Sequence, residues 1–261
     1  MAESTLSLTY PDLLQQVSQF LFGKWTTTDL TVAELAQCDA HIQSGYRRFL
    51  VPAPLPEDVQ PRSSTGHVWS FLHPTATLPT VIDDVDYALP DDWGGLAGTV
   101  TVDSTSAVSP VVERGEGEIR GLWARGTVSG PPLKFAVRPL DPTGTDGQRF
   151  ELILWPWPDA VYTMYLPYNV HPNKLTVAAP YPLGGMDHGE TILECCLAVA
   201  ERRSDDTIGI HQAAASEAMR ASIARDRAVG VPNTLGYNGD ASTDVGIPRA
   251  PYSTVNGAIP T

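Results

Sequence analysis

The sequence contains few lysines, few cysteines and no long apolar run. Lysine accounts for only three of its 17 basic residues, and 30 acidic residues bring the net charge to −13. Non-specific affinity for nucleic acids comes from Lys and Arg side chains that displace counterions, so this balance argues against sequence-independent DNA clamping. It remains compatible with an acidic wall along which DNA slides. No apolar run approaches the roughly 20 residues of a membrane span, and the first residues lack the features of a signal peptide. We therefore expect neither a membrane partner nor secretion.

The three cysteines, Cys38, Cys195 and Cys196, cannot all pair with one another. Two of them occupy consecutive helical positions, about 100° apart around the helix, which is a poor geometry for a disulfide. No metal-type Cys-x-x-Cys is present. We expect all three to be buried as small hydrophobic side chains.

Catalytic and cofactor motifs are also missing from the sequence. It contains no Gly-x-Ser-x-Gly, His-Glu-x-x-His or Walker-type loop. Residues 115–121 nearly match a dinucleotide loop, but the spacing is one residue too long, acidic side chains would repel a pyrophosphate and no helix pattern follows. The six histidines show no ligand spacing, and the aspartates of residues 83–92 have no EF-hand spacing. We expect no catalytic residue, cofactor or metal, and hence no enzymatic activity.

The two ends of the chain have the apolar periodicity and end signals of helices. Residues 9–23 place Pro11 in a first turn and Gly23 at the exit, and Thr31 and Glu34 form a capping box for a second helix.

A second helical pair follows near the end of the chain. Asp187 and Glu190 signal the start of the third helix. Its apolar stripe consists of Ile192, Leu193, Cys196, Leu197 and Ala200. A fourth helix is expected over 207–229, where seven alanines favour helix formation and close helix approach.

The middle of the chain is typical of short strands separated by turns. Strands are expected at 67–72, 98–102, 118–123, 133–138, 149–155 and 160–166. The last two are joined by Pro156-Trp-Pro-Asp159, which predicts either a β-hairpin or a tight corner. The fold class is then α+β, with a helical bundle formed by N- and C-terminal helices, an inserted antiparallel β-sandwich or barrel, and an extended C-terminal tail. The expected segments are N-terminal helices (1–52), a linker (53–66), the β-domain (67–183), C-terminal helices (184–230) and the tail (231–261).

The tail is rich in Gly, Pro, Asn, Ser and Thr and shows no helical or strand period. Such a segment cannot order itself alone, yet apolar anchors recur along it. These anchors are Leu235, Tyr237, Val245, Ile247, Tyr252, Val255 and Ile259. Spaced anchors on an extended chain suit strand addition to a partner or binding in a partner's groove, so we expect a docking tail.

The order of strands, Pro-rich link and helix over residues 152–175 and 180–203 resembles the head-to-tail adaptor (connector) proteins of tailed bacteriophages. In that family a Leu-x-Leu-x-Pro-x-Pro strand and a Tyr-rich strand precede the link, and Leu89-Pro-Asp-Asp-Trp93 matches a structural corner. The resemblance implies a virion protein of the neck that forms a ring, of twelve subunits in the family, beneath the portal protein. Such a ring joins the capsid to a tail or nozzle protein and lines a channel through which DNA passes without specific binding. The C-terminal tail would reach into the portal, and the ring interface is expected at Ala214, Ala218, Ala221 and Arg225.

Two other interpretations are open. One is a phage tail or receptor-binding β-sandwich module that oligomerises through its β-domain and does not need residues 231–261. The other is a carbohydrate-active hydrolase, with Asp/Glu pairs in the β-domain and exposed tryptophans lining a cleft. The candidates for that cleft are Trp69, Trp93, Trp123, Trp155 and Trp157.

Overall fold

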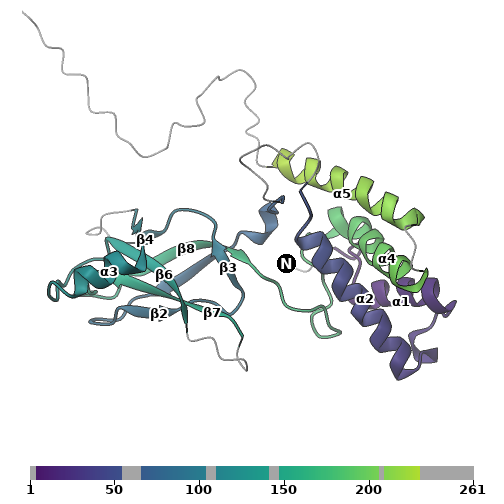
Figure 1. Cartoon of the computed structure of the whole chain (residues 1–261), viewed down its shortest axis with the longest axis horizontal. Helices are drawn as coiled ribbons and strands as arrows, with labels where there is room; N and C mark the ends of the chain where they lie inside the picture. Colours follow the sequence, from purple (N-terminus) through teal and green to yellow (C-terminus); the bar gives the residue numbers. More distant parts are fainter. Residues whose placement is uncertain (1–3, 55–65, 104–109, 141–146, 206–208, 230–261) are drawn as a thin grey trace, which may run out of the picture. The chain divides into compact units, whose positions relative to one another are not determined.

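The computed structural model describes residues 4–54, 66–103, 110–140, 147–205 and 209–229. Within these ranges the protein is of mixed α+β class, with five α-helices and two four-stranded sheets (Figure 1). The predicted α+β class is therefore confirmed. Most of the predicted linker (53–66) and all of the predicted tail (231–261) lie outside the described residues.

The helices include the four that the sequence predicts, plus one more. They are α1 (Tyr10–Phe22), α2 (Val32–Leu50), α3 (Glu116–Trp123), α4 (Gly189–Asp205) and α5 (Ile210–Val229). Short 3₁₀ turns lie at Thr27–Asp29, Ser70–Leu72 and Met186–His188.

Local contacts define where the first two helices begin and end. The side chain of Thr9 accepts from the backbone N–H of Asp12, whose carboxylate in turn accepts from the N–H of Thr9 at 2.8 Å. Thr31 and Glu34 form the same reciprocal pair at the start of α2, as predicted. At the end of α1, Gly23 adopts a left-handed conformation (φ 65°) that closes the helix.

The four terminal helices share one hydrophobic core. α2 packs against α1 and α4, and α5 packs against α4. The buried apolar residues of these helices are Tyr10, Leu13, Leu14, Val17, Cys38, Ile42, Tyr46, Phe49, Ile192, Cys195, Cys196, Leu197, Ala198, Ala200, Ala215, Met219 and Ile223. The stripe predicted on α4 is thus part of this core, and all three cysteines are buried and unpaired, as expected.

The strands form two sheets. The first contains β1 (Thr75–Pro79), β8 (Thr163–Val170), β3 (Trp93–Leu96) and β4 (Thr101–Asp103). The second contains, in order, β2 (Asp86–Ala88), β7 (Arg149–Trp155), β6 (Lys134–Leu140) and β5 (Val112–Glu113). The pairings between these eight strands are antiparallel except that of β5 with β6. The longest ladder pairs Lys134 with Trp155 and Leu140 with Arg149.

Both sheets contribute to a second hydrophobic core. Met164 and Leu166 come from β8 in the first sheet, and Phe135, Leu152 and Leu154 come from β6 and β7 in the second. Because β7 and β8 belong to different sheets, the segment Pro156–Asp159 is a corner between sheets and not a hairpin turn.

The structure corrects two of the predicted strands. Residues 118–123 lie in α3, where the i,i+4 pair Glu116–Arg120 and the spacing of Ile119 and Trp123 suit a helix that packs on β6 and β7. The helix was not predicted because α3 is only about two turns long, which is too short for a helical period to stand out in the sequence.

Residues 67–72 form no strand either, but an extended segment and a 3₁₀ turn. Trp69 is fully buried in the helical core, where its indole N–H donates to the carbonyl of Phe49 at 2.9 Å. Aromatic residues favour strands in general, but here they fill the space beside α2.

Candidate interaction surfaces

Helix α5 presents two different faces. Its inner face packs on α4, where the hydroxyl oxygens of Thr191 and Ser222 lie 2.7 Å apart. Its outer face exposes the small side chains of Ala213, Ala221, Ala224 and Ala228. Small side chains permit a close approach of another helix, so the outer face is suited to contact with a neighbouring chain.

The four residues predicted for the ring interface lie at i, i+4, i+7 and i+11 along one flank of α5. Ala221 and Arg225 are exposed, whereas Ala214 and Ala218 are half-buried. The carbonyl of Ala218 accepts a hydrogen bond from the Thr191 hydroxyl at 3.4 Å, and a guanidinium nitrogen of Arg225 donates to the carbonyl of Asp187. The four residues share one flank, but Ala218 also holds α5 to α4, and Arg225 also holds α5 to the 3₁₀ turn before α4.

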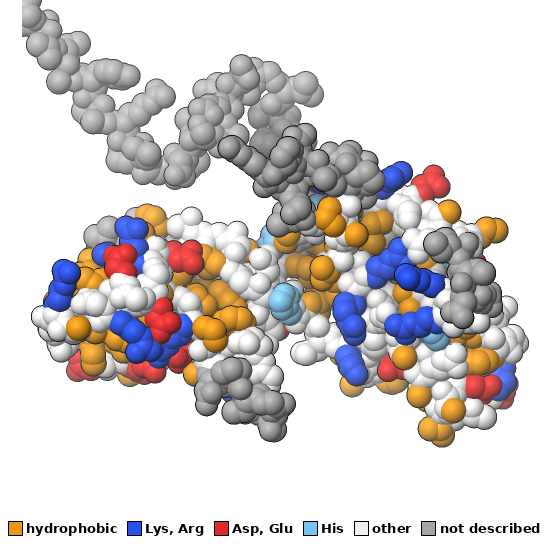
Figure 2. All heavy atoms as spheres, in the orientation of Figure 1, with side chains coloured by type: hydrophobic (Ala, Val, Ile, Leu, Met, Phe, Trp, Pro, Cys, Tyr) orange, Lys and Arg blue, Asp and Glu red, His pale blue; other side chains and the backbone are white. Residues whose placement is uncertain are grey.

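A surface with unpaired arginines lies where α2, α4 and α5 meet. Arg48 on α2 donates to Gln212 on α5 at 2.8 Å, and Arg203 on α4 donates to Ser44 on α2 at 3.2 Å. Arg48 and Arg220 line the same hollow. None of these three arginines forms an ion pair with another described residue. We call Arg48, Arg203 and Arg220 the arginine surface; Figure 2 shows basic side chains gathered over α2 and α4.

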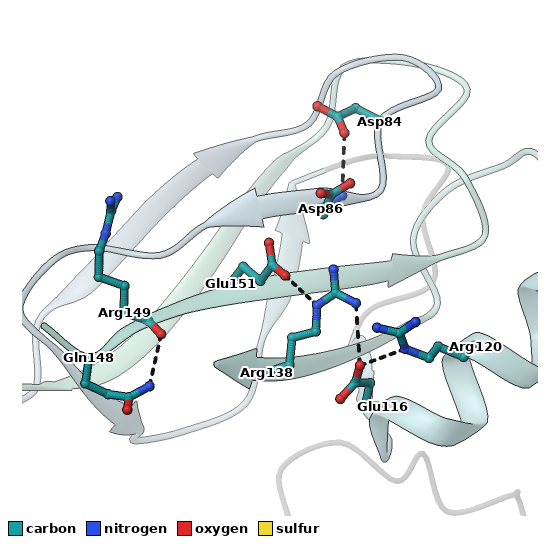
Figure 3. A network of polar contacts seen from close by, with 8 residues as sticks. All are labelled: Asp84, Asp86, Glu116, Arg120, Arg138, Gln148, Arg149 and Glu151. Carbon is teal, nitrogen blue, oxygen red and sulfur yellow. Dashed lines mark hydrogen bonds and ion pairs between the residues drawn. The ribbon is translucent and has the colours of Figure 1, made fainter. Parts of the chain in front are cut away.

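The basic residues around the sheets are, in contrast, mostly paired. Arg138 lies between Glu151, at 2.5 Å, and Glu116, at 3.5 Å, and Glu116 also accepts from Arg120 at 2.7 Å (Figure 3). The hydrogen bond from Arg120, with help from Arg138, lowers the pKa of Glu116. This network joins α3 to β6 and β7, so its charges stabilise the chain internally and are not free for a partner.

A loop between β1 and β2 carries free acidic groups beside exposed apolar ones. Val81 and Ile82 are 56% and 54% exposed, and Asp83 and Asp86 are exposed as well. We call residues 81–86 the acidic tip. The Tyr87 hydroxyl holds its backbone by accepting from the N–H of Val81 at 2.9 Å and donating to the carbonyl of Asp84 at 2.8 Å. Val81 and Ile82 are adjacent exposed apolar side chains on a loop whose backbone is held by hydrogen bonds, so the acidic tip is a candidate contact with another protein.

A buried polar cluster attaches the last turns of α5 to the segment after the linker. Asp226 accepts from the Ser70 hydroxyl at 2.6 Å and lies 2.8 Å from the Nε2 atom of His67. Burial raises the pKa of Asp226, but the hydrogen bonds from Ser70 and the interactions with His67 outweigh it and lower the pKa. The sequence alone does not indicate this cluster, because its members lie up to 159 residues apart.

The tryptophans proposed for a carbohydrate cleft do not share one surface. Trp69 and Trp93 are buried in different cores, and the other three candidates are half-buried. Among the described residues no group of His, Cys, Asp or Glu side chains is arranged to hold a metal ion. Burial also raises the pKa of the Cys38 and Cys195 thiols to about 11, which disfavours the nucleophilic thiolate form.

In the part that the structure describes, no helix is long and apolar enough to cross a membrane. The predicted tail anchors, from Leu235 to Ile259, lie outside the described residues.

A search of curated proteins gives no match. A family model described as SU10 adaptor protein matches residues 8–236, which include all five helices and both sheets. The chain therefore belongs to the SU10 adaptor protein family.

Proposed function

We propose that this protein is a head-to-tail adaptor whose copies form a closed ring beneath the portal of a tailed bacteriophage. The ring joins the capsid to a tail or nozzle protein at the neck of the virion and surrounds the channel for DNA. Family membership implies a structural protein of the phage particle that contacts other virion components, such as portal and tail. The match across residues 8–236 is the observation that carries this proposal.

The charge of the chain supports the proposed channel. A net charge of −13 gives DNA no general binding surface, so DNA slides past the ring without being held. The role is mechanical and not catalytic, and it needs no cofactor. Twelve copies per ring is the number implied by the resemblance to adaptor proteins.

The two sheets serve this role as an inserted β-sandwich. Support comes from the shared core, to which Phe135 and Leu152 of one sheet and Met164 and Leu166 of the other contribute. A closed ring needs two different surfaces on each copy. Only a contact between two different surfaces, called heterologous, can repeat from copy to copy around an axis. The flank of α5 from Ala214 to Arg225 is one of them, and the tail anchors dock on the portal.

The mass of the assembly tests the proposal directly. Native mass spectrometry is carried out on the full chain and on a truncation after Gly230, each alone and mixed with the portal protein. We expect a multi-subunit complex of the full chain with the portal, and no such complex with the truncation. A monomer indifferent to both portal and truncation would contradict the adaptor role.

Substitution of Ala221 tests the ring interface without disturbing the fold. Ala221 is exposed, whereas the half-buried Ala218 supports the contact of α5 with α4, so a charge at Ala218 would act on two contacts at once. Ala221→Arg is expected to prevent assembly with the portal. Ala36→Arg, at an exposed position of α2, is the matched control and should assemble normally. If both variants assembled normally, the α5 flank would not be part of the ring interface.

A further inference from the structure

A small hollow opens on the arginine surface. It has a volume of about 180 Å³ and is lined by Pro52, Ala53 and Pro54 after α2, Cys195 of α4, and Ala215 and Met219 of α5. The side chains of Cys195, Ala215 and Met219 are buried, so the floor of the hollow is the helical core itself. An apolar floor favours an apolar side chain of a partner, and the volume suits one branched aliphatic group.

The rim of the hollow is positively charged. Arg48 and Arg220 border it from α2 and α5, and neither has a carboxylate partner among the residues described. The chain has 13 more acidic than basic residues, so it contains many carboxylates with which these arginines could have paired. Arginines left unpaired in such a chain are available to an acidic group of another molecule.

The acidic tip has the complementary composition. It places the exposed Val81 and Ile82 directly beside Asp83, Asp84 and Asp86. The side chain of Asp84 accepts from the backbone N–H of Asp86 at 3.5 Å (Figure 3). Neither carboxylate forms an ion pair with a described residue. The tip is held in place by the N–H of Asp83, which donates to the carbonyl of Pro158 at 2.9 Å.

We propose that the hollow of one copy receives the acidic tip of the next copy, with Val81 or Ile82 on the apolar floor and the aspartates against Arg48 and Arg220. The contact joins two different surfaces and is therefore heterologous, the type that repeats around a closed ring. Ser216 and Arg220, which border the hollow, lie about 140° and 100° around α5 from Ala221, so the α5 flank stays free for its own contact in the same ring. This inference rests on the proposed ring and adds the surfaces that close it.

Charge reversal on both surfaces tests the pairing. One variant carries Arg48→Glu and Arg220→Glu, and a second carries Asp84→Lys and Asp86→Lys. In each variant the hollow and the tip have the same sign of charge, so neither should assemble with itself. In a 1:1 mixture every contact between unlike copies joins opposite charges, so rings should form in which the two variants alternate.

The readout is native mass spectrometry with one variant isotopically labelled, in the presence of the portal protein. We expect the ring population of each variant alone to fall at least about tenfold relative to wild type, because like charges are brought together. The mixture should recover the ring with equal numbers of the two variants, and added salt should weaken it.

Other outcomes overturn the inference in recognisable ways. Rings of either variant alone would show that these surfaces do not meet. Circular dichroism checks that both variants are folded. If the wild type forms rings but the mixture of the folded variants forms none, the two surfaces are not partners. If replacement of Arg48 unfolds the chain, the single variant Arg220→Glu takes its place. It is then compared, alone and mixed, with the variant that carries Asp84→Lys and Asp86→Lys. Absence of any wild-type ring with the portal would instead refute the proposed function.

Discussion

The crossing of α2 and α4 depends on the absence of a side chain at Gly45. A Cβ atom at this position would lie 2.4 Å from the Cα and 2.6 Å from the backbone nitrogen of Cys196. Both obstacles are backbone atoms, so no change of rotamer can relieve the clash. Gly45→Ala therefore requires the two helices to separate by about 1 Å before carbon atoms reach a normal contact distance near 3.5 Å.

The expected magnitude follows from two opposing effects. Alanine favours a helix over glycine by about 1 kcal/mol, which stabilises the variant. Overpacking of a well-filled core costs about 1–3 kcal/mol, and more where backbone has to move. The separation also loosens the contacts of Ile42, Ile192 and Cys196 in the same core. We expect the free energy of unfolding to fall by about 2 kcal/mol.

Urea denaturation followed by circular dichroism and tryptophan fluorescence measures this change. Trp69 reports on the same core, since its ring lies 4.6 Å from that of Phe49. Gly189→Ala is the matched control, because the three atoms nearest to a Cβ there are side-chain atoms of Leu8 at 3.5–3.7 Å and the backbone is helical. The control should be as stable as wild type or more so. A Gly45→Ala variant as stable as the control would refute the close approach of α2 and α4.

Three further predictions concern charge and burial. The pKa of Asp226 is lowered in the folded state, so its stabilising contribution is present above the ordinary value of 3.8 and is lost as the pH falls through the folded value. Asp226→Asn should therefore lower the thermal midpoint at pH 7, and the difference from wild type should shrink when the same scan is run near pH 3. Arg138→Ala should cost about 2 kcal/mol in urea denaturation because it leaves the buried Glu151 carboxylate unpaired, and Arg138→Met with Glu151→Met should recover most of the loss. The thiols of Cys38, Cys195 and Cys196 are buried and should not react with a disulfide reagent at pH 8 until the chain is unfolded. Fast reaction of the native protein would contradict their burial.

The sequence predicted best what depends on neighbours along the chain. The capping box of Thr31 and Glu34 and the left-handed exit at Gly23 involve contacts within a few residues, so their residue types identify them. The strands β6 and β7 follow from a run of β-branched and aromatic residues. The placement of Ala214, Ala218, Ala221 and Arg225 on one flank follows from the helical period alone.

Errors arose where a distant surface decided the local structure. Trp69 and its neighbours have the composition of a strand, but the helical core beside Phe49 takes them up. Helix α3 is too short for its period to be recognised, and it is stabilised by burying Ile119 against Ala136 and Ile153 of the second sheet. In both cases burial of large side chains, at about 1.5–3 kcal/mol each, outweighs intrinsic preferences of less than about 1 kcal/mol per residue.

The sequence by itself therefore determined four of the five described helices, the strands β4, β6, β7 and β8, the family and the excess of negative charge. The tertiary structure alone decided which charges remain free for partners. Arg138 and Arg220 have similar sequence surroundings, because an apolar residue follows each within a few positions. In the structure, however, Arg138 forms ion pairs with Glu151 and Glu116, whereas Arg220 borders an open hollow. The physical reason is that an ion pair depends on distances of a few ångströms between atoms that can be more than a hundred residues apart in the chain.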